Sequence, residues 1–382
     1  STIANIIYLT RINRSVENSF LFILGEEYEN VVKEWYKYYS QFYEIEEGRF
    51  EKTTDLNEVK LKNKKGVLIS SLRISPDGRY LAYVTNDRSK TKVFLRDLVT
   101  GEERRIFKKG YKNIFQETDY NYPIIEWHPR KPELDIVKLR RVNLDGKMIE
   151  EEPLTGDFQR VYSMDYLNDD DYVFSASKDG YSDLYIFQFN NRTSQRLTND
   201  YFDDLDARVI DYEGESAILF RSNRTNLSLE IQKLDTILPL KKFDLYVLKG
   251  TGKNKSLVQL TDTPQLSEQQ AYVGPEGRII YLNSNSGILN AYALNLENGT
   301  SKALTNLERN IILHYPHKNS DLHFYNYYDD GSYKTFLDVI DYEEPINVTH
   351  SVFKQQMTKT ESEEVQIPLL LEETKKIFIF FK

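Results

Sequence analysis

The apolar positions in the first fifty residues recur with the spacing of amphipathic helices. Three such segments follow one another, Ile6–Ile12, Val16–Leu24 and Val31–Phe42. Gly25, directly after the second segment, is the residue that most often ends a helix. Three helices of this length cannot bury a core of their own, so we expect them to pack against another part of the protein.

From residue 66 onward the pattern changes to short runs of Tyr, Val, Ile, Leu and Phe separated by turn residues, which is typical of strands. The first unit is the clearest, with strands at Leu72–Ile74 and Tyr80–Val84 around a Ser-Pro-Asp-Gly turn. Proline presets φ at the second turn position, and glycine accepts the positive φ that other residues avoid. Val93–Leu98 and Arg105–Phe107 complete a unit of four strands.

This unit repeats along the chain. Later units end on a Leu-Thr or Val-Thr step, and the intervals between these threonines are 43, 63, 44 and 44 residues. The threonines are Thr155, Thr198, Thr261, Thr305 and Thr349. The long second interval contains an off-pattern insertion at 223–242. Six units result, at about 66–107, 117–156, 158–198, 201–262, 264–306 and 307–349.

A period of about 40–45 residues with four strands is that of a β-propeller blade. Because a single sheet cannot hide either face, each blade needs a neighbour on both sides. We therefore predict an all-β fold, a six-bladed β-propeller of four-stranded antiparallel blades with a short α-helical N-terminal segment. The predicted domains are a helical segment at 1–50, a linker or closing strand at 51–65, the propeller at 66–349 and a tail at 350–382. Either residues 55–63 or Ile377–Phe381 would supply the strand that closes the ring.

Composition narrows the functional classes. The formal charge of −9 argues against a nucleic-acid-binding module, which normally presents a basic face. The absence of cysteine excludes disulfides, thiol catalysis and cysteine-based metal sites. No apolar run approaches the ~20 residues that span a bilayer. No cofactor is predicted.

The turn and strand motifs resemble a known repeat family. The Ser-Pro-Asp-Gly turn at 75–78, the Asp-Leu-Tyr strands at 183–185 and 244–246, and the Arg-Leu-Thr ending at 196–198 are similar to TolB-type (PD40, WD40-like) repeats. The resemblance covers about residues 66–349. It implies either a periplasmic scaffold that docks partner proteins or the amino-terminal gate of a prolyl-oligopeptidase-type enzyme, because such repeats specify the fold and not the site.

The first fifty residues carry a second resemblance. Asn5–Glu17, Phe20–Gly25 and Glu34-Trp35 resemble the helical tail of a gluzincin-like (peptidase MA-like) domain, which precedes a TolB-like propeller in large Gram-negative envelope proteins. This resemblance implies that the chain is a piece of a longer polypeptide whose zinc motif lies upstream. The alternative is that these are simply amphipathic helices packing on the propeller.

Catalytic motifs are missing from the sequence itself. A zincin requires His-Glu-x-x-His on a helix, and none of the five histidines lies in that motif. His314 and His317 are three residues apart, but the intervening Tyr-Pro opposes a helix, so we interpret their spacing as accidental. No Gly-x-Ser-x-Gly elbow of a serine hydrolase occurs. We therefore predict no catalytic, cofactor-binding or metal-binding residues and no enzymatic activity in this chain.

One acidic loop deserves comparison with a metal site. Asp200, Asp203, Asp204 and Asp206 follow Asn199 between the third and fourth units. Oxygen ligands this dense could hold Ca²⁺. Their spacing does not match an EF-hand, however, and solvated turn acids are the preferred interpretation.

The insertion provides the candidate partner-binding residues. Apolar side chains on a loop suggest docking more strongly than apolar side chains in a core. The residues are Ile231, Leu234, Ile237, Leu238 and Leu240. Alternatively, the insertion folds back over its own blade.

The predicted function follows from a complete propeller without catalytic motifs. We expect a non-catalytic protein-interaction scaffold of the bacterial cell envelope, in the periplasm or an outer-membrane assembly. Its partners would be other envelope proteins, with no nucleic acid and no transmembrane segment in this chain. The alternative is a substrate-gating or docking propeller of a zinc metallopeptidase whose catalytic domain lies upstream.

Overall fold

A computed structural model of the chain divides into two compact units, Ser1–Phe50 with Thr349–Lys382, and Glu51–Val348. It describes residues 2–46, 48–51, 57–113, 115, 117–137, 140–151, 158–229, 242–263, 265–344 and 346–358. Within these residues, no helix is both long enough and apolar enough to cross a membrane.

The first unit contains the three predicted helices, α1 (Thr2–Asn13), α2 (Val16–Leu24) and α3 (Tyr28–Glu46), and an unpredicted short helix, α4 (Val352–Thr358). The Ser15 side chain caps α2 by accepting a hydrogen bond from the Asn18 amide at 3.1 Å. The helix ends as predicted at Gly25, which has a φ of 72°.

The helices of this unit bury almost no apolar surface. Helix α1 has no buried residue, and the buried residue of α2 is Ser19. Large apolar side chains remain in contact with solvent, among them Ile7 at 65% and Phe22 at 76% exposure. The described helices of this unit therefore form no apolar core among themselves, as expected for three short helices.

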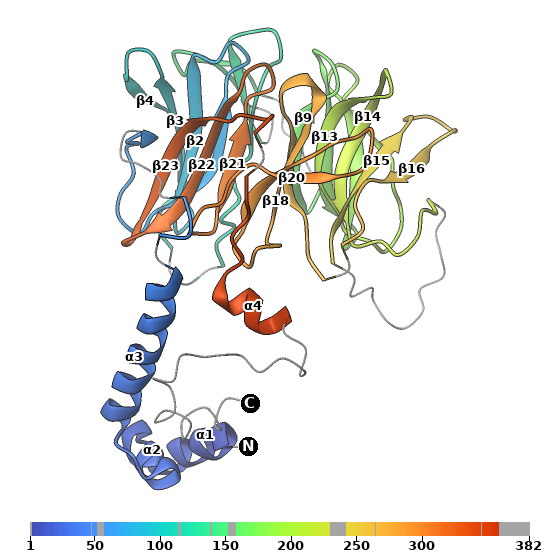
Figure 1. Cartoon of the computed structure of the whole chain (residues 1–382). Helices are drawn as coiled ribbons and strands as arrows, with labels where there is room; N and C mark the ends of the chain where they lie inside the picture. Colours follow the sequence, from blue (N-terminus) through green and yellow to red (C-terminus); the bar gives the residue numbers. More distant parts are fainter. Residues whose placement is uncertain are drawn as a thin grey trace. The chain divides into compact units, whose positions relative to one another are not determined.

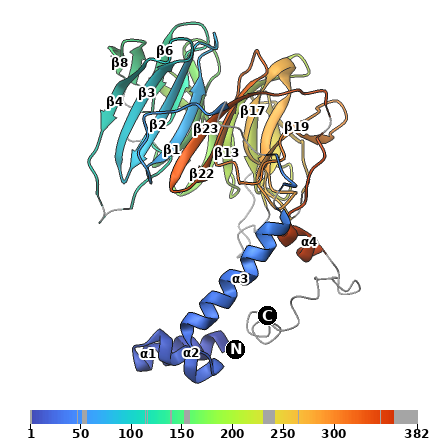
Figure 2. The same ribbon diagram turned by 60° about the vertical axis from the view of Figure 1, so that its left-hand side comes forward.

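The second unit is the predicted propeller, with six antiparallel sheets, one from each predicted repeat (Figures 1 and 2). Blades 1 to 3 contain β1 (Leu68–Ile74), β2 (Tyr80–Asp87), β3 (Lys90–Asp97), β4 (Glu103–Lys109); β5 (Ile125–Trp127), β6 (Glu133–Ile136), β7 (Arg140–Asn143), β8 (Met148–Glu151); and β9 (Arg160–Tyr166), β10 (Asp171–Lys178), β11 (Tyr181–Gln188), β12 (Thr193–Arg196). Blades 4 to 6 contain β13 (Asp204–Tyr212), β14 (Glu215–Ser222), β15 (Asp244–Lys249), β16 (Ser256–Gln259); β17 (Gln269–Val273), β18 (Ile279–Asn283), β19 (Asn290–Leu294), β20 (Ser301–Ala303); and β21 (Leu313–Pro316), β22 (Leu322–Asp329), β23 (Ser332–Val339).

The first strands of the blades form the inner wall of a closed ring. Each contacts the first strand of the next blade in chain order, and β21 of blade 6 contacts β1 of blade 1. In Figure 1 the blue strands of blade 1 stand beside the orange-red strands of blade 6, and Phe324 packs into the blade 1 core with Leu72 and Leu81. The propeller is therefore six-bladed and closed.

Ring closure uses the earlier of the two predicted segments. Blade 6 has three strands, and Glu58 forms an antiparallel bridge with Phe336 on its outer strand β23. The amide of Val59 also donates to the carbonyl of Thr335 at 2.8 Å. Residues just before blade 1 thus occupy the outermost position of blade 6. The other candidate, Ile377–Phe381, lies outside the described residues.

The repeated threonines hold the third and fourth strands of a blade together. Thr198 Oγ1 accepts a hydrogen bond from the Leu184 amide at 3.0 Å and donates to Asp183 at 3.2 Å. Thr261 and Thr305 accept the corresponding amides of the next two blades at 2.8 and 2.9 Å. The Asp-Leu-Tyr and Leu-Thr motifs of the sequence are therefore two halves of one structural contact.

Blade 2 departs from the regular pattern. Its strands have only three or four residues each, whereas the first three strands of blade 1 have seven or eight. The sequence departed from the repeat at the same place, where Trp127-His128-Pro129 stands at the turn. This blade is thus the irregular member of the ring.

Candidate functional site

A ring of polar and aromatic side chains lies on the propeller axis. Each inner strand contributes one of them, at the position where the strand approaches its turn into the second strand of the blade. The six residues are Arg73, Glu126, Asp165, Arg208, Tyr272 and Tyr315.

Contacts between blades that are not neighbours show that these side chains meet across the axis. The Arg73 guanidinium of blade 1 lies 5.2 Å from the ring centre of Tyr272 in blade 5, and donates to its hydroxyl at 3.3 Å. Arg208 of blade 4 lies 3.8 Å from Glu126 of blade 2. All four side chains are at least nine-tenths buried. The axis is therefore filled with side chains at this level.

Opposite charges compensate each other within the ring. Arg73 Nε donates to Glu126 Oε2 at 2.9 Å, in a pair that is almost fully buried. Burial alone would lower the pKa of Arg73, but Tyr272 and Glu126 outweigh it and the pKa is raised. Burial raises the pKa of Glu126, against the opposing effect of the two arginines. Removing either partner would leave a buried charge with incomplete compensation.

Backbone groups fix the ring from several sides. Trp127 Nε1 donates to the Arg73 carbonyl at 3.1 Å, and Arg208 Nη1 donates to the Met164 carbonyl at 2.7 Å. The carboxylate of Asp165 accepts from the Val209 amide at 2.8 Å. Neighbouring inner strands are thus joined through the side chains of the ring.

A funnel opens above the ring at the end of the axis where the inner strands turn outward. Its cavity volume is about 480 Å³, within the range of small-ligand and peptide pockets. The base is lined by Glu126, Asp165 and Tyr315, and Trp127 forms part of the wall. The mouth is formed by loop residues of four blades, Pro76, Pro129, Arg130, Asp169, His317, Lys318 and Asn319.

Loop-to-loop contacts support the mouth of the funnel. Arg130 of blade 2 forms an ion pair with Asp169 of blade 3, with Nε donating at 2.7 Å. His317 Nε2 lies 3.3 Å from the Pro76 carbonyl, and its Nδ1 lies 2.6 Å from Ser320 Oγ. These contacts tie blades 1 and 6 and blades 2 and 3 together at the mouth. The funnel is thus a preformed recess with a polar rim, a partly aromatic wall and a closed base.

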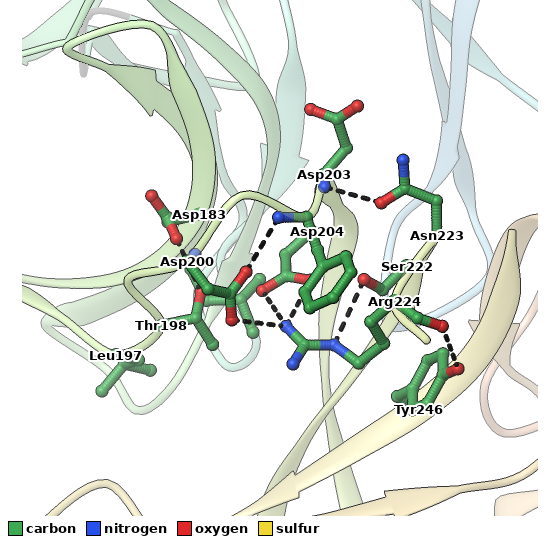
Figure 3. Close-up of polar contacts among 12 residues, drawn as sticks. Asp183, Leu197, Thr198, Asp200, Asp203, Asp204, Ser222, Asn223, Arg224 and Tyr246 are labelled. Atoms are coloured by element: carbon green, nitrogen blue, oxygen red, sulfur yellow. Dashed lines mark hydrogen bonds and ion pairs between the residues drawn. The ribbon is translucent and has the colours of Figure 1, made fainter. Parts of the chain in front are cut away.

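Two acids of the predicted loop, Asp200 and Asp204, form a cluster with Asp183, and an arginine side chain fills it (Figure 3). Carboxylate oxygens of Asp183, Asp200 and Asp204 lie within 4.8 Å of one another. Arg224 Nη2 donates to both oxygens of Asp204 at 2.8 Å and to Asp200 at 3.2 Å. Arg196 binds the third carboxylate, Asp183. Two guanidinium groups therefore neutralise the position that a calcium ion would need.

The four acids of this loop differ from the sequence-based expectation in their burial and in their placement. Asp200 and Asp204 are buried, so they are not solvated turn acids; burial raises the pKa of Asp204 to about 6 despite Arg224. The four predicted acids also do not converge. Asp203 is exposed and its carboxylate points away from the cluster (Figure 3), while Asp206 pairs with Arg221 at 2.7 Å.

The equivalent junction between blades 4 and 5 contains a carboxyl group without such a cation. Glu268 is fully buried, and its Oε1 accepts from Thr263 at 2.7 Å and from Asn283 at 3.1 Å. No hydrogen-bond partner reaches Oε2 among the described residues. Burial raises the pKa of Glu268 from 4.5 to about 7, and the charge of Asp244 adds to the effect.

We expect Glu268→Gln to flatten the pH dependence of stability. A carboxyl group with a raised folded-state pKa stabilises the fold below its unfolded pKa of 4.5, and this contribution is lost as pH rises to about 7. The wild type should therefore lose on the order of 2 kcal/mol more than the variant between pH 5 and pH 8 in urea unfolding. The exposed Glu297→Gln serves as control, and parallel curves for wild type and Glu268→Gln would contradict the assignment.

The two histidines that are three residues apart do not form a common site. His314 Nδ1 lies 3.0 Å from His323 Nε2, whereas His317 contacts Ser320 and Pro76, so the His314–His317 spacing is accidental as interpreted. The predicted partner-binding residues lie outside the described residues; they are Ile231, Leu234, Ile237, Leu238 and Leu240.

The axial ring was not found from the sequence, although a signal for it exists. Arg73, Glu126 and Tyr272 each stand three residues before a turn proline, at Pro76, Pro129 and Pro275. A charged or tyrosine residue three positions before a turn proline, in the inner strand of a blade, marks a side chain on the axis in these three blades.

Comparisons with known proteins give structural likeness only. No protein-family model matches the sequence, and neither does any curated protein. Similar solved structures include TolB from Acinetobacter baumannii, 18% identical over 75% of this chain and 56% of that one, with a TM-score of 0.33. A putative TolB from Agrobacterium tumefaciens is 13% identical over 72% and 91%, with a TM-score of 0.45. The β-propeller domain of the Trilobed protease from Pyrococcus furiosus is 17% identical over 75% and 83%, with a TM-score of 0.43. The chain thus spans little more than half of the first of these proteins, and the fold assignment rests on the strand pairing described above.

Proposed function

We propose that this chain is a non-catalytic docking module of the bacterial cell envelope, and that the funnel of its propeller receives a segment of a partner protein. The observation that carries the proposal is the combination of a blocked axis with an open funnel above it. A recess of about 480 Å³ with a polar rim and a partly aromatic wall has the anatomy of a small protein-binding site.

The blocked axis favours docking over substrate gating. A propeller that admits substrate along its axis needs a continuous passage, whereas Arg73, Glu126 and Arg208 fill the axis of this one and hold each other by charge. Opening it would separate buried ion pairs, which costs several kcal/mol.

The envelope location is supported by the resemblance of the blade motifs to TolB-type repeats and of the first fifty residues to an envelope-protein segment. It is tested separately from the docking role. Fractionation of the source organism should recover the protein with the periplasmic or outer-membrane fraction; recovery in the cytoplasm would refute the location and leave the docking role standing.

Site-specific photocrosslinking in the source organism tests the docking role. A photoreactive residue at Asn319, on the mouth of the funnel, should give a discrete partner adduct. The matched control is Asp330, an exposed residue in the turn at the opposite end of strand β22 of the same blade. Excess unlabelled full chain should reduce the Asn319 adduct by competition.

The outcome that would overturn the proposal is equally specific. An adduct at Asp330 without one at Asn319 assigns docking to the other end of the blades. The absence of a competed adduct at Asn319 removes the funnel as the docking site.

A further inference from the structure

We propose that the funnel is a socket for a cationic side chain, a lysine or arginine of the docked segment, with the carboxylate of Asp165 as its counter-ion. This inference rests on the proposed function, because the partner supplies the side chain. It adds the chemical identity of the group that enters the funnel.

Asp165 presents a fixed carboxylate that forms no direct ion pair, although the buried charge of Arg208 interacts with it at longer range. Its Oδ1 accepts from the Tyr166 amide and its Oδ2 from the Val209 amide, both at 2.8 Å. No basic group of the described residues lies within ion-pair distance of it, although it lines the base of the funnel and is only half-buried. Each carboxylate oxygen has a second lone pair, so acceptor capacity remains for an incoming donor.

The cations of the ring do not occupy this capacity. Arg73 and Arg208 are both absent from the lining of the funnel. Arg73 is bound to Glu126, and the guanidinium of Arg208 lies 4.8 Å from the ring centre of Tyr272. The carboxyl groups of Asp165 and Glu126 line the base, whereas the two ring arginines that act on them do not, so the charged groups exposed to an entering side chain at the base are carboxylates.

Charges at the mouth do not reverse this preference. Arg130 is engaged with Asp169, which lines the funnel as well. Lys318 is exposed at the rim, where solvent screens it. His317 is held between Pro76 and Ser320. A side chain that reaches the base therefore passes a rim with charges of both signs and then meets the carboxylate of Asp165.

The walls suit the stem of a long basic side chain. Trp127, Tyr315, Pro76 and Pro129 line the funnel and offer apolar and aromatic surface along its depth. Lysine and arginine pack their methylene groups on such surfaces while the charged end reaches a partner, and aromatic rings add cation–π attraction. The combination of aromatic wall and carboxylate base is selective for a cation over a neutral side chain.

The test uses tryptophan fluorescence of the full-length chain. The protein has two tryptophans, so Trp35→Phe leaves Trp127 as a reporter in the funnel wall. The probes are N-acetyl-lysine amide, N-acetyl-arginine amide, glycinamide as a free α-amine, and N-acetyl-glutamine amide as the neutral control. We expect saturable changes with the lysine and arginine probes and at least tenfold weaker binding of the neutral probe.

Two variants test whether Asp165, and not a neighbouring charge, is the counter-ion. Asp165→Asn should weaken the lysine and arginine probes at least tenfold, while Asp170→Asn, which removes a neighbouring exposed charge that does not line the funnel, should change them less than twofold. Should Asp165→Asn fail to fold, the comparison of charged and neutral probes on the Trp35→Phe protein decides alone. Saturation with glycinamide but not with lysine or arginine would reassign the socket to an amino terminus and overturn the side-chain proposal.

Equal binding of the neutral probe, or no saturation by any probe, overturns the inference. These results are distinguishable from failure of the docking role: a competed adduct at Asn319 with no cation binding leaves docking intact and removes only the cationic socket.

Discussion

Replacing Arg224 with methionine is expected to lower the free energy of unfolding of the propeller by about 3–5 kcal/mol, the usual cost of leaving buried charges uncompensated. The side chain is fully buried, at 0% exposure, and binds Asp204 and Asp200 at 2.8 and 3.2 Å. Methionine fills much of the space but brings no charge. Urea unfolding measures the difference.

The pH dependence of this variant gives a second readout. Burial raises the pKa of Asp204 to about 6 even with Arg224 present, so losing the guanidinium should raise it further. The carboxyl group can then become neutral at low pH, and the destabilisation should be smaller at pH 5 than at pH 8. Arg104→Met, which breaks an exposed pair with Asp145, is the matched control and should remain close to the wild type. Equal losses for both variants would show that Arg224 does not compensate the cluster.

Arg73→Met at the axis is expected to cost about 2–4 kcal/mol, somewhat less than Arg224→Met, because Arg208 remains 3.8 Å from Glu126. The variant removes the 2.9 Å bond to Glu126 and the contact with the Tyr272 ring. Chemical denaturation again provides the measurement.

A double-mutant cycle isolates the charge contribution of this pair. Glu126→Gln in the Arg73→Met background removes a carboxylate whose compensation is already incomplete, so the double variant should lose less stability than the sum of the two single variants. If the two substitutions instead add independently, the pair is not coupled and the ring is held by packing alone.

The blades could be predicted from the sequence because their signals are local. A Ser-Pro-Asp-Gly turn and the strand that follows it lie within about ten residues, and the Leu-Thr step recurs at a nearly constant interval. Thr198 and Leu184 are only fourteen residues apart, and their hydrogen bond recurs in the next two blades. Periodicity therefore reveals contacts that each repeat makes in the same way.

The neutralised acidic cluster could not be predicted in this way. Arg224 lies beyond strand β14, 20 residues from Asp204, and occurs at the root of the insertion that interrupts the repeat. In the sequence, a dense group of acids indicates a solvated or metal-binding loop, because the arginine that pairs with it lies elsewhere in the chain. Only tertiary packing brings the arginine into the cluster.

The axial site escaped prediction for a different reason. Each blade contributes one residue at one equivalent position, but the residues themselves differ, with arginine at position 73, glutamate at 126 and tyrosine at 272. A search for similar residues cannot find a ring whose members are complementary. Their shared distance from a turn proline is a positional signal, and it becomes informative only when the blades are already known.

The bridge between Glu58 and Phe336 has a consequence for synthesis of the protein. The amino-terminal partner leaves the ribosome long before blade 6 is translated, so the two sides of the seam meet last. Until then Leu72 and Leu81 of blade 1 lack the Phe324 side chain that covers them in the finished ring. The apolar face of blade 1 thus stays uncovered in the nascent chain until the last blade of the ring has been made.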